Sequence, residues 1–132
     1  MLEGEHFVWA GQTALKFYDR LVVDENYNGL ALDYDEGERI SRAAGDADIV
    51  MLKNHGPLVL GPSIAEAWDD LYYLERAAEV QLKAMASGRA LKPVATEVAS
   101  AACRQMMIGN AQNARLHLES VKRSLAGEGF EG

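Results

Sequence analysis

The sequence predicts an α/β fold, with a thin sheet in the first half of the chain and helices dominating the C-terminal part. Two observations lead to this prediction. Short apolar runs, most of them rich in β-branched residues, alternate with helical patterns before residue 62. Three segments with helical periodicity then follow one another without a strand between them. Such alternation is typical of layered α/β domains, and we expect at most four strands, two of them short.

The overall composition suits one soluble domain, 1–132. Apolar residues make up 48% of the chain and charged residues 25%, as is usual for globular proteins. No apolar run approaches the roughly 18 residues that would indicate a membrane-spanning helix. The first residues lack the basic start and apolar core of a signal peptide. The single Cys103 excludes an internal disulfide, so we expect a cytoplasmic location.

The charge of the chain bears on its partners. The net charge is −7 and the pI is near 4.9, which argues against binding to the phosphate backbone of a nucleic acid. The net charge does not exclude small anionic metabolites as ligands, because they can bind locally.

The first elements are short. A helix is predicted from about Gln12, within 8–20, and a β-branched strand at 20–24. The side chains expected to face inward from the helix are Ala14, Phe17 and Tyr18. Asn28-Gly29 indicates a turn, and residues 30–33 are predicted as a second short strand.

A helix and two strands come next. Asp35, followed three residues later by Glu38, resembles a capping box, and Gly45 suits the end of this helix. The runs "DIVMLKN" and "PLVLG", at 48–54 and 57–61, predict two buried strands. They are joined through Asn54-His55-Gly56.

Three helices complete the chain. Ser63 with Glu66 predicts a capping box at the start of a long helix that ends at Gly88. Its expected apolar stripe is Ile64, Trp68, Leu71, Leu74, Ala78, Leu82 and Met85. Two further helices are predicted at about 93–108 and 111–125, the second with the stripe Ala114, Leu118, Val121 and Leu125. Residues 127–132 are predicted to be a disordered tail.

Only a few side chains are candidates for chemistry. His55 at a strand end suits a metal ligand pointing into a cleft, or a turn histidine bonded to the backbone. His6 is expected in a frayed terminus and His117 on the solvent-exposed surface. Cys103 is expected to be a small core residue. No His-x-His, His-Glu-x-x-His or cysteine pair occurs.

Acidic and aromatic residues along the long predicted helix have a simpler interpretation. Their spacing suits a solvated or salt-bridged face for Glu66, Asp69, Asp70, Glu75 and Glu79. Of these, Glu75 falls nearest the apolar stripe, where a partly buried carboxylate needs a partner. The tyrosines of this helix, Tyr72 and Tyr73, are expected to pack with their hydroxyl groups in water.

Residues 12–88 resemble the class II aldolase and adducin family. The segments that carry the resemblance are "QTALKFYDRL", "NYNGLALDYDEGERI", "MLKNHGPLVLG" and "SIAEAWDDLYYLERAAEVQLKA". The resemblance implies a three-layer α/β/α domain and commonly a homo-oligomer. It implies that His55 is one of three histidines holding a catalytic divalent metal, usually Zn²⁺. That metal acts as a Lewis acid on a hydroxy-carbonyl substrate, often a sugar phosphate.

The resemblance covers only the C-terminal half of the family's domain. The family's His-x-His pair and its catalytic acidic residue lie upstream of the matching region, so one of three metal histidines is present here. The chain is therefore interpreted as a truncated product, one half of a split protein, or a stand-alone relict. Asn54 and Gly56 are candidates for orienting His55 or for simple turn chemistry.

These patterns predict an aldolase-type lyase or related epimerase, incomplete as this chain alone. A non-catalytic, adducin-like interaction or oligomerisation module is the alternative. The expected partners are the small-molecule substrate and a second copy or a complementing N-terminal half, with no nucleic acid and no membrane. Catalytic and substrate-binding residues are not identifiable from the sequence.

Overall fold

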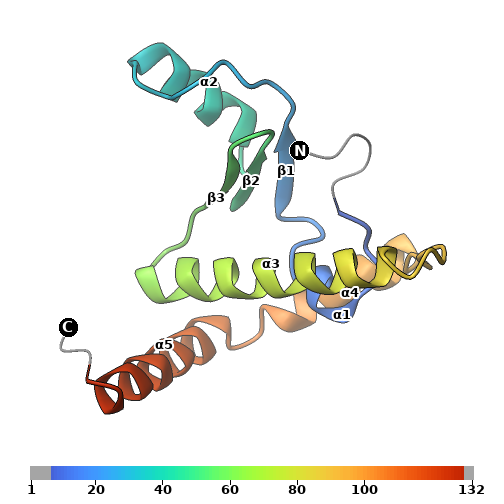
Figure 1. Ribbon diagram of the computed structural model, residues 1–132, viewed down its shortest axis with the longest axis vertical. Coiled ribbons are helices and arrows are strands. Elements are labelled where there is room, and N and C mark those ends of the chain that lie inside the picture. The colour runs from blue at the N-terminus through green and yellow to red at the C-terminus, as the bar shows by residue number, and fades with distance from the viewer. Residues whose placement is uncertain (1–6, 130–132) are drawn as a thin grey trace.

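The computed structural model describes residues 7–129 and shows an α/β arrangement rich in helices (Figure 1). The elements in chain order are α1 (Gln12–Leu15), β1 (Leu21–Asp24), α2 (Tyr34–Ala44), β2 (Ile49–Leu52), β3 (Gly56–Val59), α3 (Ile64–Met85), α4 (Thr96–Met106) and α5 (Asn110–Gly127). The sheet stands above α3, and α1, α4 and α5 lie with α3 at the opposite end of the molecule from α2 (Figure 1).

The sheet has the strand order β1-β2-β3. β1 and β2 are parallel and connected through α2, as a crossover requires. β2 and β3 are antiparallel, with Ile49 opposite Val59. The predicted strand at 30–33 is wrong: these residues form no strand, and Leu30 and Leu32 are exposed. They lie in the connection between β1 and α2 and pair with neither edge of the described sheet.

α2 begins earlier than predicted. Asp33, not Asp35, is its N-cap, and its carboxylate accepts a hydrogen bond of 2.8 Å from the backbone N–H of Glu36. Asp33 and Glu36 have the same three-residue spacing as the predicted pair, so spacing alone did not distinguish the two starts. The helix ends before Gly45, as predicted.

The first helix is shorter than its pattern suggests. After Leu15 the chain continues through hydrogen bonds between residues three apart, such as Phe17 N–H to Ala14 C=O at 3.0 Å. This tighter winding still turns Ala14 and Phe17 inward, and Phe17 is fully buried.

The start of α3 is confirmed. The Ser63 hydroxyl accepts from the backbone N–H of Glu66 at 3.2 Å and contacts the Glu66 carboxylate at 2.9 Å. Its buried face differs from the predicted stripe. The buried residues of α3 are Asp69, Asp70, Leu74 and Ala77. Four residues of the predicted stripe are exposed instead: Ile64, Leu71, Leu82 and Met85. The helix is apolar on more than one side, so periodicity alone could not fix which side faces the core.

The two C-terminal helices are confirmed, with shifted ends. α4 starts at Thr96, later than predicted, and α5 extends to Gly127. Ala114 is fully buried and Leu118 and Val121 are half-buried, whereas Leu125 is largely exposed. Of the predicted tail, Gly127 ends α5, and 130–132 lie outside the described residues.

The core lies where α1, the sheet and α3 meet. Its buried members are Phe7, Ala14, Phe17, Ile49, Leu74 and Ala77. It therefore fixes the sheet against α3, while α5 packs along the other side of α3. Within residues 7–129, no helix combines the length and apolarity needed to cross a bilayer.

Candidate functional site

His55 lies in the tight turn between β2 and β3. Asn54 before it has φ of 61° and Gly56 after it has φ of 147°. The backbone N–H of His55 donates to the carbonyl of Leu52 at 3.1 Å. Asn and Gly tolerate positive φ better than other residues, so the Asn-His-Gly sequence suits this turn and holds the histidine at the end of the sheet.

The His55 side chain is exposed and lines two cavities, of about 220 Å³ and about 200 Å³. The larger is formed with the loop after β1 and with α2, and the smaller with the strand ends of the sheet. The imidazole makes no hydrogen bond or ion pair with another part of the described chain. It is therefore available to a ligand.

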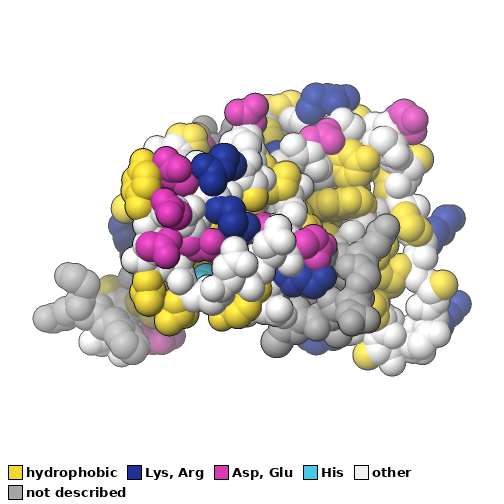
Figure 2. All heavy atoms as spheres, turned by 90° about the horizontal axis from the view of Figure 1, so that it is seen from above, with side chains coloured by type: hydrophobic (Ala, Val, Ile, Leu, Met, Phe, Trp, Pro, Cys, Tyr) yellow, Lys and Arg dark blue, Asp and Glu magenta, His cyan; other side chains and the backbone are white. Residues whose placement is uncertain are grey.

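Charged groups beside the larger cavity are paired with one another. Arg39 lies 2.7 Å from Asp24 and donates to both carboxylate oxygens of Glu36, at 2.8 and 2.9 Å. Arg39 and then Asn28 hold the pKa of Glu36 at about 2. Lys53 pairs with Glu25. Acidic side chains gather beside basic ones on the face that Figure 2 shows. In α2 and its N-cap, Asp33, Asp35, Glu36 and Glu38 outnumber Arg39 and Arg42, so this end of the molecule is acidic on balance although many of its charges are paired.

The described residues do not form a complete metal site. Across 7–129, no three histidine, cysteine or acidic side chains lie together in a way that could hold a metal ion. His55 is thus a single potential ligand without partners in this part of the chain. His6, predicted in a frayed terminus, lies outside the described residues.

His117 is not the solvated surface residue that was predicted. Its Nδ1 lies 2.7 Å from Oδ1 of Asp69, and its side chain is 25% exposed. The rings of Trp68 and Tyr72 meet it edge-on at centroid distances of 4.8 Å. The prediction failed because the partners come from α3, which no local pattern in α5 reveals.

A group of charges, buried except at Asp48, joins α1, α3 and the start of the sheet. Lys16 Nζ lies 2.6 Å from Asp69 and 2.9 Å from Asp70, and Arg20 contacts Asp70 at 2.5 Å and Asp48 at 2.7 Å. Burial opposes the charge of Arg20, but Asp70 and Asp48 outweigh it and raise the pKa. A salt-bridged face was predicted, but its burial was not.

One signal in the sequence pointed to this network. Lys16 and Arg20 stand four residues apart in the segment "ALKFYDRL", whose one other charged residue is Asp19, and Asp69-Asp70 lies between Trp68 and Leu71. Charges embedded in apolar runs need partners, and these two sets complement each other.

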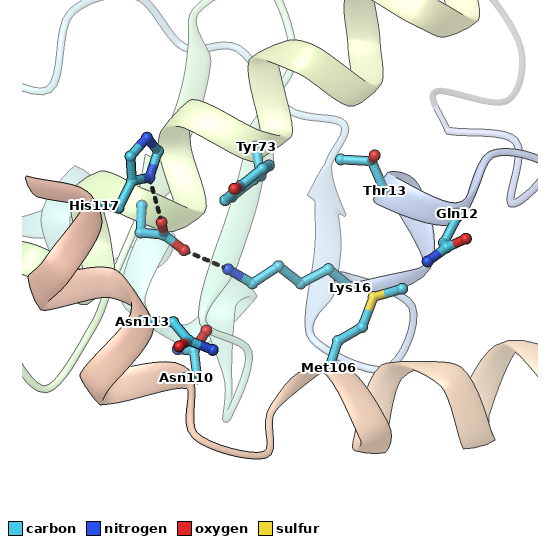
Figure 3. Close-up of a pocket in the computed structure, with 9 residues that line it drawn as sticks. Gln12, Thr13, Lys16, Tyr73, Met106, Asn110, Asn113 and His117 are labelled. Carbon is cyan, nitrogen blue, oxygen red and sulfur yellow. Dashed lines mark hydrogen bonds and ion pairs between the residues drawn. The ribbon is translucent and has the colours of Figure 1, made fainter. Parts of the chain in front are cut away.

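The network opens into a third cavity of about 440 Å³ between α1, α3 and α5 (Figure 3). The lining residues are Gln12, Thr13, Lys16, Asp69, Tyr73, Met106, Asn110, Asn113 and His117. None of them lines the cavities around His55. Sequence reasoning did not identify this cavity, because its walls come from four separate segments.

The burial of the other candidate residues tests the roles that were predicted for them. Glu75 is exposed, so its predicted partial burial is wrong: it projects from the outer side of α3. Cys103 is buried, and its thiol donates to the carbonyl of Lys16 at 3.4 Å, which confirms a core role. Tyr72 and Tyr73 pack edge to face at 5.3 Å and stay partly exposed, as predicted.

The chain is similar to several known proteins. A family model described as "Class II Aldolase and Adducin N-terminal domain" matches residues 1–82. A "Putative aldolase class 2 protein" of Caulobacter vibrioides is 38% identical over 82 residues, which are 62% of this chain and 32% of that protein. A Streptomyces roseochromogenus protein named "4-hydroxy-3-prenylphenylpyruvate oxygenase/4-hydroxy-3-prenylbenzoate synthase" is 35% identical over 96 residues, 72% of this chain and 34% of that one.

Solved structures give the same result. An aldolase II superfamily protein from Pseudomonas syringae matches 92% of this chain and 49% of its own, with a TM-score of 0.82 and 32% identity. An L-fuculose 1-phosphate aldolase from Glaciozyma antarctica matches 95% of this chain and 47% of its own, with a TM-score of 0.77; at 21% identity it bears on the fold alone. The predicted class II aldolase-like fold is confirmed. The chain spans about a third of the curated relatives it matches and about half of these solved chains.

Proposed function

Because the chain belongs to the class II aldolase and adducin family, we propose that it forms part of an aldolase-type lyase. His55 supplies one ligand of a divalent metal, with Zn²⁺ as the first candidate. The remaining ligands come from outside residues 7–129. The substrate class that we propose for the complete site is a small hydroxy-carbonyl compound, including phosphorylated sugars. A cytoplasmic location stays a prediction.

The observation that carries this proposal is the state of the His55 side chain. It is exposed at the end of the sheet, lines two cavities and has no partner within the described chain. A structural histidine usually satisfies its ring nitrogens, whereas a metal ligand must keep one of them available. The turn fixes the backbone on both sides of His55 through Asn54 and Gly56. We assign these two residues to holding the imidazole in place.

The metal content of a chimeric protein tests the proposal. In this chimera, residues 7–129 replace the matching half of the Pseudomonas syringae protein, and the other half of that protein supplies the rest of the fold. We expect about one Zn²⁺ per chain by elemental analysis and cleavage of a phosphorylated ketose. His55→Ala should lose both.

The control in the same chimera is His117→Ala, which removes a histidine that does not line the His55 cavities. It should keep the metal. Retention of metal by His55→Ala would contradict the proposed ligand, and a folded chimera with metal but no lyase activity would contradict the proposed reaction. The unmodified 132-residue chain, measured alongside, should bind Zn²⁺ weakly, because a single imidazole is a poor site.

A second candidate is an adducin-like interaction or oligomerisation module. The observation that favours it is the set of large apolar side chains left exposed on α3, which includes Ile64 at 84%, Val80 at 60% and Leu82 at 54% exposed. Exposed apolar surface of this kind favours association. Sedimentation of the chain at increasing concentration tests it, with Leu82→Glu expected to weaken self-association. A monomer at every concentration would argue against a homo-oligomer and leave a different protein chain as the partner.

A further inference from the structure

The cavity between α1, α3 and α5 has the features of a binding site for a small molecule. Its volume of about 440 Å³ is within the range of ligand pockets. It is walled by polar side chains from α1 and α5, with Tyr73 and Met106 adding apolar surface (Figure 3). None of the residues assigned to the His55 site contributes to it.

Asn110 is the residue that indicates a ligand. It is only 7% exposed, yet its side-chain amide forms no hydrogen bond with any other residue in 7–129. Neither amide atom is among the enclosed side-chain atoms that lack a partner in 7–129, so the amide reaches the open volume of the cavity although the residue as a whole is buried. In Figure 3 Asn110 extends from the start of α5 into the cavity, on the side where the Lys16 side chain ends. A molecule in the cavity, water or a ligand, can therefore supply its hydrogen bonds.

The charges in the cavity cancel. Lys16 and Asp69 are its formally charged lining residues, and they pair with each other at 2.6 Å. A phosphate or carboxylate ligand would meet the Asp69 carboxylate without gaining a free cation. A cationic ligand would have to compete with Lys16. The electrostatics thus favour an uncharged ligand.

The uncharged side chains that line the cavity favour a ligand with hydroxyl groups over a ligand with a planar ring. Gln12, Thr13 and Asn113 each offer a donor and an acceptor, which matches groups that both donate and accept. Stacking is disfavoured, because the Lys16 ammonium already lies over the Tyr73 ring, 5.0 Å from its centroid. Planar heterocycles usually need such a ring face.

We propose that this cavity binds a small uncharged polyol, a molecule with several hydroxyl groups and no net charge. Asn110 and Asn113 hydrogen-bond the hydroxyl groups from α5, and Thr13 does so from α1. The Asp69 carboxylate accepts a hydrogen bond from a further hydroxyl group, beside its contacts with Lys16 and His117. Met106 contacts the carbon chain of the ligand.

Titration of the isotope-labelled full chain with xylitol, followed by two-dimensional NMR, tests the proposal. We expect saturable shifts of the side-chain amides of Asn110 and Asn113. Adenosine and inorganic phosphate are the comparison probes, for a planar and an anionic ligand, and should not saturate the same signals. Tighter binding of either one than of xylitol would overturn the assigned ligand class.

Three variants locate the binding. Asn110→Leu should weaken xylitol binding about tenfold, from the lost hydrogen bond and the filled volume. Asn113→Leu obstructs the same cavity from an exposed position on α5, so it tests the site even if Asn110→Leu fails to fold. Gln112→Ala changes an exposed residue of the same helical turn that does not line the cavity, and should bind like the wild type.

The outcomes separate this site from the one at His55. His55→Ala should bind xylitol unchanged. Absence of saturable shifts with the wild type, or equal binding by the wild type and Asn113→Leu, would overturn the proposal. Equal weakening in Gln112→Ala would overturn it as well, because the effect would then not come from the cavity.

Discussion

The Nδ1 atom of His117 lies 2.7 Å from one oxygen of Asp69, while the other oxygen of the same carboxylate lies 2.6 Å from Lys16 Nζ. One side chain of α3 thereby holds α5 on one side and the end of α1 on the other (Figure 3). The contact with His117 closes the helical layer, and the contact with Lys16 links that layer to the chain entering the sheet.

Asp69→Ala should therefore destabilise the protein strongly. Removing one member of a buried charge pair costs about 3–5 kcal/mol, because the remaining charge stays buried with less compensation. Urea unfolding followed by circular dichroism measures this change. The control is Glu38→Ala, whose pair with Arg42 at 3.2 Å is largely exposed and is worth about 0.5 kcal/mol or less. Similar losses in both variants would contradict the role given to Asp69.

Two glycine substitutions should have opposite effects. A Cβ on Gly61 would lie 2.9 Å from the backbone nitrogen of Ala67 and 3.3 Å from its Cα, whereas one on Gly37 would meet nothing within 4 Å. We expect Gly61→Ala to cost about 1–3 kcal/mol through this clash. Gly37→Ala, inside α2, should gain about 0.5–1 kcal/mol. Thermal unfolding of both variants decides this, and a stabilised Gly61→Ala would show that the loop before α3 can move away.

Stability should fall in acid because of the carboxylates around Arg39. The pKa of Glu36 is lowered from 4.5 to about 2, mainly by the Arg39 hydrogen bonds. Burial would raise the pKa of Asp24, but its bonds from Asn26 and Arg39 outweigh this and lower it. Groups with a lowered pKa stabilise the fold fully above their unfolded-state pKa, and this stabilisation is lost as the pH falls through the folded-state value.

Arg39→Gln tests this dependence. Its deficit in unfolding free energy relative to the wild type should be full above pH 4.5 and shrink as the pH falls toward about 2. Arg42→Gln, on the exposed side of α2, is the control and should show a small deficit throughout. A deficit for Arg39→Gln that does not change with pH would mean that its role is packing alone.

The thiol of Cys103 should react slowly in the folded protein. Burial raises its pKa, and the thiolate is the reactive form. Alkylation by iodoacetamide, followed by mass spectrometry, should be much slower in the native chain than in urea. Equal rates in the two conditions would contradict the burial of α4 against the segment after α1.

Local patterns predicted the elements whose signals are complete within a few residues. The Ser63–Glu66 box marked the start of α3, and the two apolar runs around Asn54-His55-Gly56 marked β2 and β3. The strand at 30–33 was predicted from composition, but a strand requires a paired neighbour, and these residues pair with neither edge of the described sheet. At His55 the sequence predicted the place of the residue, and its role there stays a prediction.

The buried side of α3 is the clearest case of a feature that the sequence left open. Its predicted stripe and its observed buried face share Leu74, but the observed face also contains Asp69 and Asp70. Periodicity ranks apolar residues above charged ones, whereas burial of a carboxylate depends on a cation arriving from elsewhere. Lys16, which is 53 positions from Asp69 along the chain, is that cation.

The sequence by itself determined the α/β class, the turn that presents His55 and the start of α3, because caps, glycines and apolar periods act over a few neighbouring residues. Only the tertiary structure decided that His117 contacts Asp69. It also decided that the Asn110 amide, which has no hydrogen-bond partner in 7–129, lines a cavity. Those relationships depend on how α1, α3 and α5 pack against one another, and that packing is set by the summed burial of many side chains rather than by any local pattern.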